Sequence, residues 1–177
     1  PGNNVYVGCR FPADIRYRRA IQEEARKVGA VLARDGVVGW FGIDFIVAPA
    51  SSDGSWHVFL SEINLRLGGT THPFWMARLA TGATYDRGAG QLVAGGTVKS
   101  YVASDNLKSV RLHGRSPAEV IETVDAAGLG FEPGSRTGAT LHLLGALPDH
   151  GKMGVTSIAD DPAEAEERYR AVEAILL

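Results

Sequence analysis

The stretch HVFLSEINLRL, residues 57–67, ends in a regular two-residue alternation of apolar and polar residues. Side chains of a β-strand point alternately to the two faces of its sheet. The pattern therefore predicts a strand with one apolar face and one polar face. The apolar face consists of Phe59, Ile63, Leu65 and Leu67. The polar face consists of Glu62, Asn64 and Arg66.

A second apolar run, WFGIDFIV at residues 40–47, precedes this strand and contains a single acid, Asp44. Residues 48–55 between the two runs are rich in turn-forming residues, which predicts an antiparallel hairpin. Asp44 and Glu62 are equally far from Asp53, near the middle of the loop. We therefore expect Asp44 to face Glu62 across the hairpin, to within a residue or two.

Opposed residues of an antiparallel pair have Cβ atoms about 4.5–5.5 Å apart, so two carboxylates in these positions repel each other unless a cation lies between them. Mg²⁺ accepts oxygen ligands from one or two carboxylates and from substrate phosphates. Asn64 adds a neutral carbonyl oxygen, and a set of oxygen ligands favours Mg²⁺ or Mn²⁺ over zinc. The alternative is that these polar residues are only the solvated face of a strand.

The remaining segments predict an α+β chain. Helical spacing and end signals predict helices at 14–34, 72–81, 116–127 and 163–176. The third opens with a capping box, Ser116-Pro117-Ala118-Glu119. Strands are expected at 5–7, 98–102, 138–147 and 152–158, with a turn at 8–12.

Composition excludes several classes of protein. The 177 residues include 18 basic and 20 acidic side chains, which argues against sequence-independent binding of nucleic acid. Cys9, the single cysteine, permits no intramolecular disulfide and no Cys-rich zinc site. No apolar run reaches the roughly 18–20 residues of a membrane span. We expect a cytoplasmic protein without nucleic-acid or membrane partners, and the excess of arginine over lysine suggests a bacterial source.

Two segments together resemble the C-terminal half of the ATP-grasp fold: GIDFIV at 42–47 and EINLRLGGTTHP at 62–73. The GGTTHP extension, YVASDNL at 101–107 and the C-terminal tail are similar to peptide ligases related to pheganomycin biosynthesis. The motifs cover residues 5–85.

The resemblance implies a division of the chain into two parts. Residues 1–100 would form the C-terminal ATP-grasp subdomain, an antiparallel sheet with flanking helices. Residues 101–177 would form a small α/β region packed on it. Because the chain begins at Pro1, we expect it to be part of a longer protein.

The resemblance also implies an activity, the ATP-dependent ligation of a carboxylate to an amine through an acyl-phosphate. Asp44 would hold one Mg²⁺ (or Mn²⁺), Glu62 would bridge two ions and Asn64 would complete the second. Arg66 would contact the transferring phosphoryl group or the substrate carboxylate. The acceptor pocket would be shaped by Thr70, Thr71 and His72.

ATP-grasp enzymes clamp ATP between two subdomains. The N-terminal one, which supplies the phosphate-contacting lysine and the hinge that binds adenine, has no counterpart in this sequence. We therefore expect the isolated chain to be inactive. Its expected partners are ATP, a carboxylate donor, an amine acceptor and the missing subdomain. Two other functions stay open, a non-catalytic ATP-grasp-like scaffold and an ATP-grasp kinase.

Two weaker signals have structural explanations. Arg16, Arg18 and Arg19 are interpreted as a solvated helix face, with a nucleotide contact as the alternative. His142, within an apolar run, is interpreted as a core or edge histidine whose hydrogen bonds are satisfied.

Overall fold

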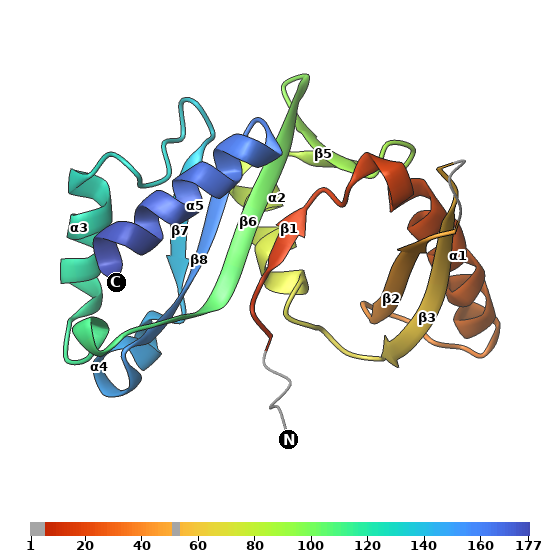
Figure 1. Ribbon diagram of the computed structural model, residues 1–177, viewed down its shortest axis with the longest axis horizontal. Helices are drawn as coiled ribbons and strands as arrows, with labels where there is room; N and C mark the ends of the chain where they lie inside the picture. The colour runs from red at the N-terminus through yellow and green to blue at the C-terminus, as the bar shows by residue number, and fades with distance from the viewer. Residues whose placement is uncertain (1–5, 51–53) are drawn as a thin grey trace.

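The computed structural model describes residues 6–50 and 54–177 (Figure 1). Its largest element is a six-stranded antiparallel sheet with the order β4-β5-β6-β8-β7, and β1 pairs with β6 beside this path. The strands of this sheet are β1 (Cys9–Phe11), β4 (Thr84–Asp86), β5 (Gln91–Ala94), β6 (Thr97–Lys108), β7 (Gly138–His142) and β8 (Lys152–Ala159).

Helices cover both faces of the sheet. The helices are α1 (Ile15–Arg34), α2 (Thr71–Thr81), α3 (Pro117–Ala126), α4 (Leu147–His150) and α5 (Pro162–Leu176), with 3₁₀ turns at Val110–Leu112 and Leu144–Ala146. Successive residues of β6 pack on opposite sides, because strand side chains alternate. Tyr101 and Ala103 join a core with Ala77 of α2, and Val102 joins one with Ala165 of α5.

A separate two-stranded hairpin consists of β2 (Gly42–Pro49) and β3 (Trp56–Asn64), and it packs against α1. In Figure 1, α1 and the hairpin lie together on one side of the molecule, and β6, β8, α3 and α5 lie on the other. Asp14 caps α1 by accepting a hydrogen bond from the backbone N–H of Arg16. The rings of Tyr17 and Trp56 lie 5.1 Å apart and join the helix to the hairpin.

The predicted α+β class, with an antiparallel sheet and flanking helices, is confirmed. The capping box at Ser116 is also confirmed, because its hydroxyl accepts from the N–H of Glu119 and the Glu119 carboxylate accepts from the N–H of Ser116. The proposed division at residue 100 stays a prediction, and that position lies within β6.

Several predicted strand bounds are wrong. The first strand is Cys9–Phe11, where the sequence predicted a turn, and Val5 of the predicted strand lies outside the described residues. The strand predicted to reach residue 67 ends at Asn64. Residues 144–147, predicted as the end of a strand, are helical instead, after Leu143 adopts a left-handed conformation with φ 56°.

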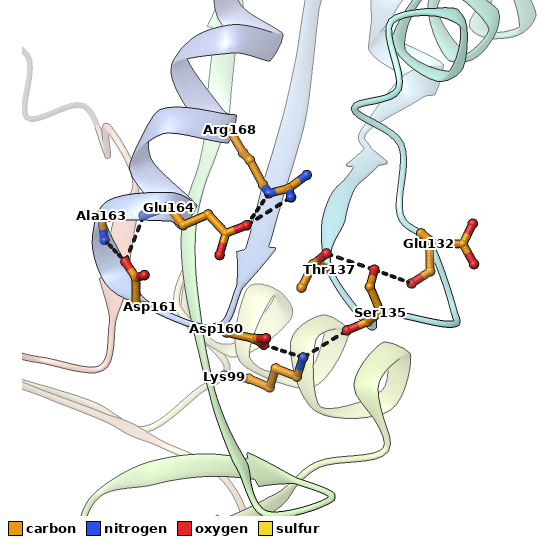
Figure 2. Close-up of polar contacts among 9 residues, drawn as sticks. All are labelled: Lys99, Glu132, Ser135, Thr137, Asp160, Asp161, Ala163, Glu164 and Arg168. Carbon is orange, nitrogen blue, oxygen red and sulfur yellow. Dashed lines mark hydrogen bonds and ion pairs between the residues drawn. The ribbon is translucent and has the colours of Figure 1, made fainter.

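A buried lysine, Lys99, connects β6 to two other segments of the chain (Figure 2). Lys99 of β6 is 3% exposed and lies 2.5 Å from the Asp160 carboxylate, and its Nζ also donates to the carbonyl of Ser135 at 3.2 Å. The next residue, Asp161, caps α5 through the N–H groups of Ala163 and Glu164. Lys99 therefore ties β6 to the start of α5 and to the loop before β7.

Candidate functional site

Asp44 and Glu62 are directly opposed residues of the β2–β3 hairpin. Opposed side chains of an antiparallel pair lie on the same face, so both carboxylates project from one side of the hairpin. Ile43, Phe45 and Val47 are partly buried on one face of β2, which packs against α1. Asp44 lies on the other face and is exposed. The opposition of Asp44 and Glu62 expected from the sequence is therefore present. Asp53, from which the two positions were counted, lies outside the described residues.

Asn64 belongs to the same face. It is opposed to Gly42, two residues before Asp44, and its Nδ2 donates a hydrogen bond of 3.2 Å to Oδ2 of Asp44. The amide oxygen of Asn64 is thereby turned away from the Asp44 carboxylate and stays available as an acceptor. The structure thus brings together Asp44, Glu62 and Asn64.

A β-bulge next to this pair changes the rest of the strand. Phe45 is opposed to Leu60 rather than to Ser61, so Ser61 is the extra residue. The bulge reverses the alternation, and Phe59 lies on the face of Asp44 and Glu62 instead of the face of Ile63. The prediction of one apolar face containing both Phe59 and Ile63 is therefore wrong.

Two exposed apolar side chains flank the acids as a result. Ile46 and Phe59 are opposed to each other, and they are 60% and 54% exposed. The face that carries the acids is therefore not uniformly polar.

Arg66 lies beyond the end of β3. Its backbone N–H donates to the carbonyl of Asn64 at 2.7 Å, and its Nη1 donates to the carbonyl of Leu67 at 3.1 Å. No ion pair joins Arg66 to Asp44 or Glu62 in the described part of the chain. Arg66 was expected on the polar face of the strand, but it lies in a turn after the strand has ended.

The GGTTH segment closes a tight turn before α2. Gly68 and Thr71 bond reciprocally, since the Gly68 N–H donates to Oγ1 of Thr71 and the Thr71 N–H donates to the Gly68 carbonyl. Thr70 is the N-terminal cap of α2, with no hydrogen bond from its side chain to the helix. His72, two residues after Thr70, reaches the sheet.

His72 lines a cavity of about 270 Å³ between α2, β6 and the end of β7. Its ring lies 4.4 Å from that of His142, and Asp105 supplies a carboxylate to the lining. Gly154 is opposed to His142, and a Cβ at this position would overlap the imidazole. The absence of a side chain there makes room for the ring.

His142 is partly buried, and its Nδ1 has no hydrogen-bond partner. The pKa of His142 is lowered to about 4, mainly by burial and to a lesser extent by the neighbouring His72, while Asp105 opposes the shift. The expectation that His142 is fully satisfied is therefore wrong. The proximity of His142 to His72 could not be predicted from the sequence, because 70 positions separate the two residues and no local pattern links them.

The oxygen-rich hairpin face carries the ligands that the sequence predicted for a divalent ion. Among residues 6–50 and 54–177, no group of three or more His, Cys, Asp and Glu side chains is arranged to hold a metal. Asp44 and Glu62 supply two carboxylates, and the third predicted ligand is an amide. Such a set suits Mg²⁺ completed by substrate phosphates, rather than an ion held by protein ligands alone.

Comparisons with known proteins point to one group. Residues 119–172 match the model of a family described as the PGM1 C-terminal domain. The chain is 35% identical over 171 residues to the L-propargylglycine–L-glutamate ligase of Streptantibioticus cattleyicolor, covering 97% of this chain and 34% of that enzyme.

A solved structure matches the whole chain. The ATPase subunit of phosphoribosylaminoimidazole carboxylase from Aquifex aeolicus aligns with 100% of this chain and 49% of its own, with a TM-score of 0.51 and 16% identity. That identity shows a shared fold alone. The chain is thus similar in sequence to part of an amino-acid ligase and similar in fold to part of an ATPase subunit. It spans about a third of the curated relative's length.

The described helices include none that is both long and apolar enough to cross a membrane.

Proposed function

We propose that this chain is the C-terminal part of an ATP-dependent ligase that joins a carboxylate to an amine. The observation that carries the proposal is the direct opposition of Asp44 and Glu62, with Asn64 hydrogen-bonded to Asp44. Like charges held side by side are costly unless a cation compensates them. The 35% identity to a ligase of two amino acids supports the same class of reaction.

In this proposal Asp44, Glu62 and Asn64 would hold two Mg²⁺ ions. Glu62 is opposed to Asp44 across the hairpin and lies two residues before Asn64 on β3, so it would contact both ions. Bound there, the ions would neutralise charge on the ATP phosphates. Ile46 and Phe59 would restrict water around the phosphates, because they border the acids on the same face.

The reaction proposed is a two-step ligation. A carboxylate oxygen of the donor attacks the γ-phosphorus of ATP, the bond to the β-γ bridging oxygen breaks, and ADP leaves. The amine nitrogen of the acceptor then attacks the acyl carbon, inorganic phosphate leaves, and the nitrogen loses a proton. Arg66, two residues beyond Asn64, would stabilise negative charge on the transferring phosphoryl group or the donor carboxylate.

The cavity beside His72 is proposed as the acceptor pocket. Thr71 fixes the turn that begins α2 through its bonds to Gly68, and Thr70 leaves its hydroxyl free of the helix cap. His72 and Asp105 line the cavity, and the carboxylate of Asp105 would attract an acceptor that arrives as an ammonium ion.

The test uses the full-length protein and a panel of amino acids and dipeptides. ADP release and the mass of the product are measured together. A ligase yields ADP and an amide-linked product, and an Asp44→Asn/Glu62→Gln double variant should abolish both. A phosphorylated product without an amide bond would indicate a kinase instead. ATP turnover unaffected by the double variant would contradict the proposal.

A non-catalytic scaffold makes a different prediction. A scaffold requires no divalent ion, so the two acids could be replaced without loss of its function. The isolated 177-residue chain is expected to show little or no ligase activity, because the nucleotide-clamping subdomain of such enzymes would be missing. Robust turnover by that chain alone would overturn this division of roles.

A further inference from the structure

A second, larger cavity of about 1030 Å³ lies between β1, the first turn of α1, β6 and the beginning of α5. Its volume is in the range of pockets that bind small molecules. Its lining includes apolar and aromatic residues, among them Ile15, Val102 and Tyr169. The described residues that line it include none of those assigned above to the metal ions, the phosphoryl group or the acceptor.

Arg18 of α1 lines this cavity and is 7% exposed. The expectation that it belongs to a solvated helix face is therefore wrong. Its Nε is buried without a hydrogen-bond partner, and no ion pair involves its guanidinium within the described parts of the chain. A buried guanidinium is costly when nothing neutralises it.

The acids of the cavity wall have other partners. Glu166 pairs with Arg10 at 2.8 Å, and Asp160 pairs with Lys99 at 2.5 Å. Asp14 pairs with Arg16 at 2.7 Å. Hydrogen bonds from Arg16 are the main reason that the pKa of Asp14 falls to about 2, and the charge of Arg18 contributes a lesser share.

Two further features of the cavity concern the stem of Arg18 and a second unpaired polar group. Gly90, in the turn before β5, approaches the arginine stem so closely that a Cβ there would lie 3.1 Å from Cδ of Arg18. Ser100 of β6 lines the same cavity, is fully buried, and has a hydroxyl without a hydrogen-bond partner. The cavity therefore contains a buried cation and a buried hydroxyl, each without a partner.

We propose that this cavity binds a small organic carboxylate with an aromatic or apolar body. The guanidinium of Arg18 would bind the carboxylate with the paired geometry that arginine forms with planar anions, and Ser100 would donate a further hydrogen bond. Val102, on the same face of β6 as Ser100, and Tyr169 of α5 pack together, line the cavity and would contact the apolar body. This site is separate from the proposed ligase site and does not depend on its function.

Calorimetric titration of the full-length protein with benzoate tests the proposal, at constant ionic strength with chloride as the buffer anion. Wild-type protein should bind benzoate, and Arg18→Met should weaken binding by more than about tenfold, because a charge-assisted bond is lost. Arg19→Met is the matched control, since Arg19 is the exposed neighbour on the same helix and its loss changes the net charge equally. It should bind as the wild type does.

Benzamide, which has the same ring without the charge, should bind much more weakly than benzoate. Ser100→Ala should weaken benzoate binding by a few fold. This variant tests the site without changing the charge of Arg18. Arg18→Lys keeps the charge but loses the paired geometry, so it should retain part of the affinity. This variant also tests the site if Arg18→Met fails to fold.

The thermal midpoint of each variant without ligand distinguishes a free ligand from a carboxylate of another segment of the protein. If the site awaits a free ligand, Arg18→Met should unfold at the same temperature as the wild type or higher, because an uncompensated buried charge is removed. A fall of several degrees, together with no benzoate binding by the wild type, would show that Arg18 already has an internal partner. That result, or equal affinity for benzoate and benzamide, would overturn the proposal.

Discussion

Asp44 of β2 is opposed to Glu62 of β3, and the register of the two strands shifts immediately after this pair. The bulge at Ser61 leaves the acids in the regular part of the ladder and moves Phe59 beside them. Bulges often re-aim side chains next to functional sites. The same local irregularity therefore positions the acids and gives them an apolar border.

Glu62→Gln in the full-length protein should lower kcat by about 100- to 1000-fold, with a smaller change in the KM for ATP. Glutamine preserves the size of the side chain and the strand pairing, but one negative charge facing the proposed ions is lost. Steady-state kinetics with ATP measure both constants. Glu122→Gln, on the exposed side of α3, is the matched control and should have no effect. A variant that keeps more than about a tenth of the wild-type kcat would show that Glu62 does not bridge metal ions.

Binding of Mn²⁺ offers a test that is independent of activity. Electron paramagnetic resonance of free Mn²⁺, titrated with the protein and a non-hydrolysable ATP analogue, should show two bound ions. Asp44→Asn should weaken this binding strongly because an anionic ligand becomes neutral, and Asn64→Ala should weaken it less because water can replace a neutral ligand. Equal effects of the two variants would argue against the assigned ligand roles.

Stability should depend on His142 at mildly acidic pH. The pKa of His142 is about 4 in the folded protein and near 6.5 in an unfolded chain, so the unfolded state binds more protons between these values. Stability should therefore fall as the pH is lowered from about 6.5 toward 4. The groups facing His142 are His72, which lowers its pKa, and Asp105, which raises it.

The variant His142→Gln should make the thermal midpoint less dependent on pH in that window. His113→Gln is the control, because His113 is exposed and lies outside the cavity. Thermal melts between pH 4 and 7 measure the slope for each protein. A slope that is the same in wild type and His142→Gln would mean that another group causes the loss of stability.

Gly138→Ala should destabilise the protein by more than about 2 kcal/mol. Gly138 begins β7 with φ 122°, and a Cβ there would overlap the carbonyl oxygen of Gly130. Gly145→Ala is the comparison, because its added Cβ would meet nothing within 4 Å, and the change should be less than about 1 kcal/mol. Urea unfolding of both variants gives the two free energies. Similar free-energy changes for the two variants would show that the backbone near Gly130 moves to accommodate the added methyl group.

Local chemistry in the sequence determined the elements that depend on neighbouring residues. The Asp14 cap and the Ser116–Glu119 capping box each join residues at most three positions apart, so the helix starts could be predicted. The opposition of Asp44 and Glu62 could also be predicted, because a hairpin brings together residues equally far from its turn.

Tertiary structure alone decided the features that join distant segments. The bulge at Ser61, which put Phe59 on the acidic face, depends on how β3 pairs with β2 and not on the alternation within β3. The burial of Arg18 depends on the turn before β5, where Gly90 approaches the Arg18 stem although 72 positions separate the two residues. The contact between His72 and His142 depends on packing α2 beside β7. A helical or strand pattern fixes which residues share a face, but what covers that face is set by long-range contacts that periodicity does not record.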